Sequence, residues 1–210
     1  NTGSYLRMLN DNAQFLGRLG LTVTDVDELW NYEVMQAYGL SSIPVLDSAA
    51  DSIVAAPGVA LNLSRHFGSN VRARNSTGWF GRGWYTPWQA QLLVESGGDM
   101  VKLVGEAGAA EVFTRDVRNN GYFSAKGDSS TLLAAGGGVY ELRQPNGMVS
   151  RYRADGRIDF VQDPNGNRVT AAWDAAGRLQ SLTHTSGGWI SLAYNGAGLV
   201  QSVTNSAGRS

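Results

Sequence analysis

The chain is 210 residues long, with 42% hydrophobic and 17% charged residues, a composition close to that of average globular domains and one that argues against disorder. A net charge of -1 gives no overall positive charge for binding nucleic acid or an anionic membrane, so either would need a local basic patch, and no apolar run is long enough to span a bilayer. Cysteine is absent, which excludes disulfides and thiolate metal sites, whereas 27 glycines and 6 tryptophans beside 2 histidines indicate tight turns between aromatic-bearing strands.

Residues 1–56 are predicted to form a small helical region followed by a connector. A capping box with Asp27 in place of the usual glutamate begins at Thr24, and apolar residues follow at helical intervals as far as Gly39, which predicts a helix over residues 25–38. A second helix is expected over residues 6–19. Residues 41–57 contain two prolines and several small residues, and this composition is typical of a connector.

Residues 57–130 change to a β pattern that precedes the repeats described next. Short alternating segments are separated by clusters of glycine, asparagine and serine, as in a chain of strands and turns. The strands predicted in this region cover residues 59–63, 89–94, 100–104 and 111–114. A further strand is predicted at residues 139–142.

Residues 131–210 contain an internal repeat with a period of about 21 residues. Tyr152, Trp173 and Tyr194 are equally spaced at this period, and four further columns keep the same spacing. These columns are Gly156, Gly177 and Gly198; Ile158, Leu179 and Val200; Val161, Leu182 and Val203; and Gly166, Gly187 and Gly208.

Each repeat is interpreted as two short strands and two glycine turns, for example strands at residues 168–174 and 178–183. The fold class predicted is therefore mainly β, an antiparallel β-meander preceded by a small helical region. Ile158 and Val161 are three positions apart and would face opposite sides of an ideal strand. Either a bulge lies between them or both sheet faces carry apolar contacts. The three aromatic residues of the repeat are expected to point to one side of the sheet.

The segment from Gly166 to Leu179 resembles a YD repeat, the glycine, aromatic-Asp and Gly-Arg-Leu unit of Rhs proteins, wall-associated proteins and teneurins. Trp173 stands where these repeats usually have tyrosine, and Arg178 is the arginine of Gly-Arg-Leu. Residues 60–84 are similar to the region that opens the repeat array in such proteins. The structural repeat residues are Tyr152, Gly156, Gly166, Trp173, Gly177, Arg178, Gly187, Tyr194, Gly198 and Gly208.

The resemblance implies a secreted or cell-surface protein, of bacterial origin, whose strands spiral into a hollow β-shell. Its implied role is structural, in adhesion, surface assembly or toxin encapsulation, rather than enzymatic, and it implies no cofactor. The expected partners are other segments of the parent protein or further copies of it, which would pair with an exposed strand edge around residues 199–204. Surface glycans are a further possible partner.

Asp163, Asn165 and Asn167 place oxygen-bearing side chains at alternate positions, as at the start of a calcium loop. An EF-hand would have glycine at the sixth position and glutamate at the twelfth, where this chain has Arg168 and Asp174. A hairpin turn explains the same residues, and we favour the turn over a metal site.

Two alternative functions are open. Trp79, Trp84 and Trp88 could form a stacking platform for sugars in an adhesin module, although core packing explains them better unless they are exposed to solvent. A glycosidase would need two facing acids, whose separation the sequence does not give. The candidate acids are Glu106, Glu111, Asp116, Asp155 and Asp159. His66 and His184 have no recognisable catalytic motif around them and are interpreted as ordinary strand residues.

Overall fold

The computed structural model describes residues 2–18, 23, 26–27, 29–30, 32, 45–68, 74–95, 97–105, 110–119, 121–124 and 129–208. It begins with helix α1 (Thr2–Arg18), which matches the helix predicted at residues 6–19. Leu9 and Leu16 lie on one face of α1 and are buried together with Leu29. Within the helix predicted at 25–38, residues 26, 27, 29, 30 and 32 are helical, and the others lie outside the described residues. No helix in these ranges is long and apolar enough to cross a membrane.

Strand β1 (Val45–Val54) occupies most of the segment that the sequence predicted as a connector, so that prediction was wrong. β1 pairs antiparallel with β2 (Leu61–Gly68), and β5 (Trp84–Tyr85) pairs with the other edge of β2. Serine, alanine and aspartate dominate β1, and two register shifts against β2 interrupt its alternation. Pairing with the strand that follows it in sequence, rather than the propensity of its own residues, therefore produces this strand.

The largest element of the molecule is a sheet of twelve strands, β6 to β17, in which consecutive strands pair antiparallel. This confirms the predicted mainly β fold and the antiparallel meander, which begins earlier than the repeats do. The strands are β6 (Gln91–Val94), β7 (Met100–Val104), β8 (Ala110–Arg115), β9 (Gly121–Phe123), β10 (Thr131–Gly136), β11 (Val139–Arg143), β12 (Val149–Tyr152), β13 (Ile158–Gln162), β14 (Arg168–Trp173), β15 (Leu179–His184), β16 (Trp189–Tyr194) and β17 (Val200–Asn205). Before them come a small hairpin, β3 (Thr77–Gly78) and β4 (Gly81–Arg82), and the 3-10 helix η1 (Pro87–Gln89).

The hairpins from β11 to β17 share one five-residue turn. The N–H of its first residue donates to the carbonyl of the fifth, and the N–H of the glycine at the fourth position donates back to the first carbonyl. Each of these glycines has a positive φ, which favours glycine over residues with a Cβ. Turns with both bonds begin at Gln144, Arg153, Asp163, Asp174, His184 and Asn195.

A β-bulge explains how a repeat of odd length keeps its aromatic residues on one face of the sheet. The strand register shifts by one residue at each aromatic residue. Tyr152, Trp173 and Tyr194 pair with residues 158, 179 and 200, respectively. The next residue of the partner strand, 159, 180 or 201, is left unpaired. Without this extra residue, strict alternation would turn successive aromatic residues to opposite faces. The bulge alternative is therefore confirmed, because Leu179 and Leu182 on either side of the extra residue are both fully buried.

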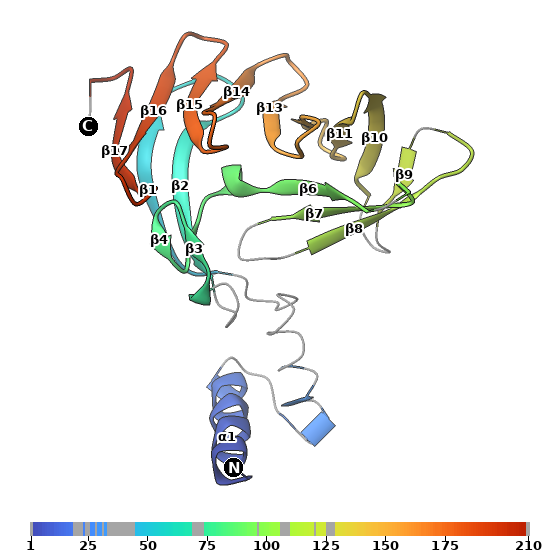
Figure 1. Ribbon diagram of the computed structural model, residues 1–210, viewed down its shortest axis with the longest axis vertical. Coiled ribbons are helices and arrows are strands. Elements are labelled where there is room, and N and C mark those ends of the chain that lie inside the picture. Colours follow the sequence, from blue (N-terminus) through green and yellow to red (C-terminus); the bar gives the residue numbers. More distant parts are fainter. Residues whose placement is uncertain are drawn as a thin grey trace.

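One hydrophobic core joins the two sheets. Leu61 and Leu63 of β2 are buried in the same cluster as Tyr152, and Trp173 and Tyr194 pack against that cluster. The aromatic column therefore faces one side of the sheet, as predicted. Figure 1 shows the long sheet curving, with β6, β7 and β8 turned back beneath β10–β13, while β1 and β2 lie against β15, β16 and β17.

Candidate inter-repeat interface

Each aromatic residue at a bulge in the last two repeats binds the backbone of the preceding repeat. The indole Nε1 of Trp173 donates a hydrogen bond of 2.8 Å to the carbonyl of Ile158. The hydroxyl of Tyr194 donates one of 2.7 Å to the carbonyl of Leu179. Tyr194 follows Trp173 by one repeat, and Leu179 follows Ile158 by one repeat. The same contact therefore occurs in two successive repeats. A tryptophan can replace the tyrosine here because it also carries a hydrogen-bond donor.

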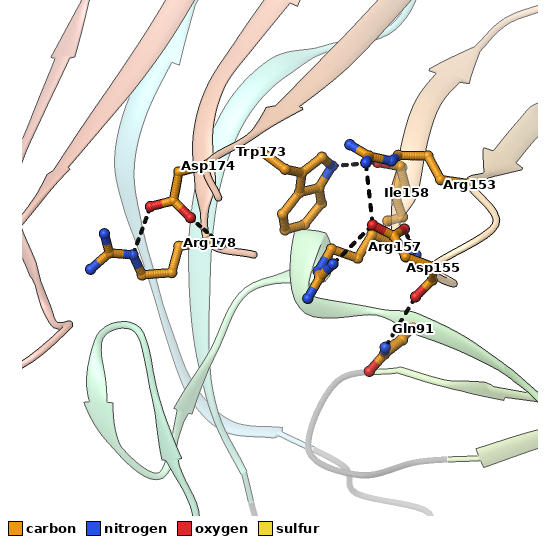
Figure 2. Close-up of polar contacts among 8 residues, drawn as sticks. All are labelled: Gln91, Arg153, Asp155, Arg157, Ile158, Trp173, Asp174 and Arg178. Carbon is orange, nitrogen blue, oxygen red and sulfur yellow. Dashed lines mark hydrogen bonds and ion pairs between the residues drawn. The ribbon is translucent and has the colours of Figure 1, made fainter. Parts of the chain in front are cut away.

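An arginine from the preceding repeat covers the ring of each aromatic donor. The Cζ atom of Arg157 lies 5.8 Å from the ring centre of Trp173, and that of Arg178 lies 4.6 Å from the ring centre of Tyr194. Such cation–π contacts stabilise by about 0.5–1 kcal/mol at exposed sites. Arginine, aromatic ring and carbonyl therefore form a repeated contact between neighbouring units, which Figure 2 shows for Trp173.

Aspartates in the turns hold these arginines. Asp174 accepts hydrogen bonds from the backbone N–H of Arg178 and from its Nε, both at 2.8 Å. The backbone N–H bond is the main reason that the pKa of Asp174 lies below its usual range. Asp155 binds the side chains of Arg157 at 2.9 Å and Arg153 at 3.3 Å. The arginine is thus fixed at its own turn while its guanidinium reaches the next repeat (Figure 2).

The twelve-stranded sheet curves so far that its first strand, β6, contacts the turn of residues 153–157, which follows β12. The N–H of Leu92 in β6 donates to the carbonyl of Gly156 at 2.8 Å, and Gln91 forms an isolated antiparallel bridge with Arg157. A Cβ atom on Gly156 would collide with the Leu92 carbonyl oxygen, so this approach requires glycine. We call this contact between β6 and residues 153–157 the closure contact.

The other end of the twelve-stranded sheet contacts the sheet of β1, β2 and β5 and the hairpin of β3 and β4. The N–H of Val200 donates to the carbonyl of Trp79 at 2.8 Å. The amide of Asn205 donates to the hydroxyl of Ser52 at 2.9 Å in a buried contact. Residues 45–94 therefore contact the repeats at both ends of the described array.

The calcium candidates form a hydrogen-bonded turn. Asp163 is buried and accepts bonds from the backbone N–H groups of Asn165 and Asn167 at 2.9 Å and from the Asn167 amide at 2.7 Å. The Asn167 amide is the main cause that lowers the pKa of Asp163. A Cβ atom on Gly58 would collide with this carboxylate, so the β1–β2 loop covers it. No group of three or more histidine, cysteine, aspartate or glutamate side chains that could hold a metal ion occurs among the described residues.

The three tryptophans proposed as a sugar platform are engaged with the protein. Trp88 is buried in the core, and Trp79 packs edge to face against Trp173 with ring centres 5.8 Å apart. Trp84 is half-buried between Phe67 and Arg65, with 5.4 Å between its ring centre and that of Phe67. This arrangement fits core packing better than a row of exposed rings.

The acids considered for a glycosidase are distributed over several turns and strands. Asp116 is paired with Arg118 at 2.8 Å, Asp155 with Arg157, and Asp159 lies 3.7 Å from Arg151. Glu111 lies in β8, and Glu106 lies outside the described residues. Arginine-paired carboxylates on turns are typical of structural ion pairs rather than of a catalytic acid and base.

His184 has a more definite role than the sequence suggested, whereas His66 contacts the hydroxyl of Ser64 at 3.3 Å. His184 is almost fully buried at the first position of a turn, and its Nδ1 accepts the backbone N–H of Ser186 at 2.9 Å. It therefore takes the role that Asp163, Asp174 and Asn195 have at the first position of their turns. Arg157 was also missed, although its spacing of one full repeat from Arg178 was a signal that could have found it.

Residues 45–113, about a third of the chain, match a family described as "Domain of unknown function (DUF6531)". The match begins at the first residue of β1 and ends within β8, so it covers the segment that carries β6 and the small hairpin but not the repeats. Among curated proteins, none is significantly similar in sequence to this chain.

Proposed function

We propose that this chain is a structural segment of a large secreted or cell-surface YD-repeat protein of the Rhs-like type, of bacterial origin, and that it forms part of a β-shell. The closure contact carries the proposal. A sheet of twelve strands that curves until β6 meets the turn after β12 has the geometry of the first turn of a spiral wall.

The repeated inter-repeat contact supports the same function. Each unit offers a carbonyl and an arginine to the next unit and receives an aromatic donor from it, so further units can be added by the same chemistry. A wall of this kind serves adhesion, surface assembly or toxin encapsulation by enclosing or displaying other segments. It requires no cofactor and no catalytic residue.

Expression of the whole parent protein tests the proposal. We expect electron microscopy to show a hollow particle and limited proteolysis to spare the segments that it encloses. In parallel, the present chain should not hydrolyse polysaccharides. An extended array without an interior, or glycan hydrolysis that Asp155→Asn abolishes, would overturn the structural role.

The edge of β17 adds a prediction about association. β17 ends the long sheet and pairs within it with β16; its Val200 N–H already donates to the Trp79 carbonyl, whereas Gln201 and Ser202 have exposed side chains. Strand edges of this kind recruit further strands, which here would be another segment of the parent protein or another copy. We expect light scattering to detect association of the chain and Gln201→Lys to reduce it, since lysine discourages edge pairing. A persistent monomer at high concentration would contradict the expectation.

A further inference from the structure

The turn of residues 153–157 is the place where three parts of the chain meet. Its backbone receives β6 through the Leu92 N–H, and the side-chain amide of Gln91 reaches the carbonyl of Asp155 at 3.4 Å. Its last residue, Arg157, extends in the other direction to Trp173 of the following repeat. Figure 2 shows Gln91 on one side of this turn and Trp173 on the other.

This turn departs from its two equivalents in the array. In those turns the aromatic residue is followed at once by Asp174 or Asn195, whose side chain binds the turn backbone. After Tyr152 comes Arg153, and the acid is displaced by two positions to Asp155. Asp155 is then held by arginines on both sides while its own carbonyl faces β6. The repeat pattern is therefore altered at the one turn that makes the closure contact among the described residues.

Arg157 touches every part of this junction. It pairs with Asp155 at 2.9 Å, forms the bridge with Gln91 through its backbone, and covers Trp173. A Cβ atom on Gly177 would collide with the Arg157 guanidinium, so the turn of the next repeat packs against it as well. Arg178 makes the corresponding contacts with Asp174 and Tyr194, but its turn does not receive β6.

We propose that residues 153–157 are a binding site for strand β6 and that Arg157 couples closure of the sheet to docking of the next repeat. Arg157 acts as a positioning residue, because movement of its turn away from β6 also withdraws its guanidinium from Trp173 and Gly177. The coupling is reciprocal, so that loss of either contact weakens the other. The inference rests on the proposed function only in treating the curved sheet as a wall.

Hydrogen exchange on the full chain tests this coupling with a matched pair of variants, Arg157→Gln and Arg178→Gln. Each removes one guanidinium, one ion pair and one ring contact. We expect Arg157→Gln to accelerate exchange roughly tenfold both in residues 91–94 and in residues 168–179. Arg178→Gln should accelerate exchange near residues 189–200 and leave residues 91–94 unchanged. Acceleration by Arg157→Gln that is confined to residues 168–179 would overturn the coupling.

A second matched pair tests closure from the opposite direction. Gly156→Ala forces a Cβ against the Leu92 carbonyl, whereas Gly198→Ala has the same positive φ, +77° against +80°, with no atom within 4 Å. Gly156→Ala should accelerate hydrogen exchange roughly tenfold both in residues 91–94 and in residues 168–179. Gly198→Ala should accelerate exchange in neither segment. Equal effects of the two variants would refute a β6 site at this turn. Neither result depends on a hollow particle or on hydrolysis, so failure here is distinct from failure of the proposed function.

Discussion

The repeats from β12 to β17 and the strands from β1 to β5 are built in opposite ways. Along the repeats, each strand pairs with its neighbour in sequence through a turn that carries its own glycine and side-chain acceptor. β1 is rich in small residues and pairs with β2 in a register that shifts twice, and β2 pairs with β5 across the segment that contains the small hairpin. The first region is specified locally, and the second takes its form from long-range contacts.

The two regions are vulnerable to substitution at different places. We expect a repeat to tolerate substitution at an exposed strand position but not where its turn contacts a neighbouring unit. The β1–β5 region depends on the repeats that it covers, for example through Ser52 with Asn205 and Trp79 with Val200.

Turn glycines should show the largest difference. Gly177→Val and Gly198→Val place a β-branched side chain at φ values of +75° and +77°, which costs about 1–3 kcal/mol in each case. Gly177→Val should lose about 0.5–1 kcal/mol more, because its Cβ displaces Arg157 from Trp173. Urea unfolding followed by far-UV circular dichroism measures both variants. Equal losses would mean that backbone strain alone decides the cost and that the arginine contact contributes nothing.

The repeats could be predicted from the sequence, whereas β1 and the closure contact could not. The repeat period, the turn glycines and the aromatic column were visible because each repeat carries its own signals at fixed spacing. β1 was missed because its residues resemble a connector and its partner determines its conformation. The closure contact was also missed, since nothing in the local pattern of Gln91 indicates that it lies beside Arg157, with the strands from β7 to β12 between them in sequence.

A second difference concerns two carboxylates of the repeats. Asp163 is a buried carboxylate that accepts three hydrogen bonds, so Asp163→Ala should be destabilising. Its loss leaves backbone donors of the turn without partners, which is costly when they are buried. We expect a clear fall in melting temperature. Asp159→Ala should change stability by less than about 1 kcal/mol, since its contact with Arg151 is an exposed ion pair. A similar melting temperature for both variants would contradict the structural role of Asp163.

The stability that Asp174 contributes should depend on pH. Hydrogen bonds from Arg178 lower the pKa of Asp174 below its usual value of 3.8, so the folded state favours the ionised form. Its contribution is fully present above the unfolded pKa and is lost as pH falls through the folded pKa. The stability difference between the wild-type protein and Asp174→Asn should therefore be present at pH 7 and shrink below about pH 4. Denaturant unfolding at several pH values measures it. A difference that is constant with pH would show that ionisation of Asp174 does not contribute.

The smallest expected effect is that of Tyr194→Phe, which removes one hydroxyl and keeps the ring beneath Arg178. The lost hydrogen bond to the Leu179 carbonyl is a neutral one, and such bonds contribute about 0.5–1.5 kcal/mol. Tyr122→Phe is the matched control, because it removes a similar bond to the carbonyl of Gly98 outside the repeats. The two variants should lose comparable stability, yet only Tyr194→Phe should accelerate hydrogen exchange in residues 179–194, since its bond joins two repeats. Burial raises the pKa of Tyr194, so the wild-type hydroxyl stays protonated and able to donate across the neutral range. Unchanged exchange in residues 179–194 would mean that the ring and its arginine, rather than the hydroxyl, hold neighbouring repeats together.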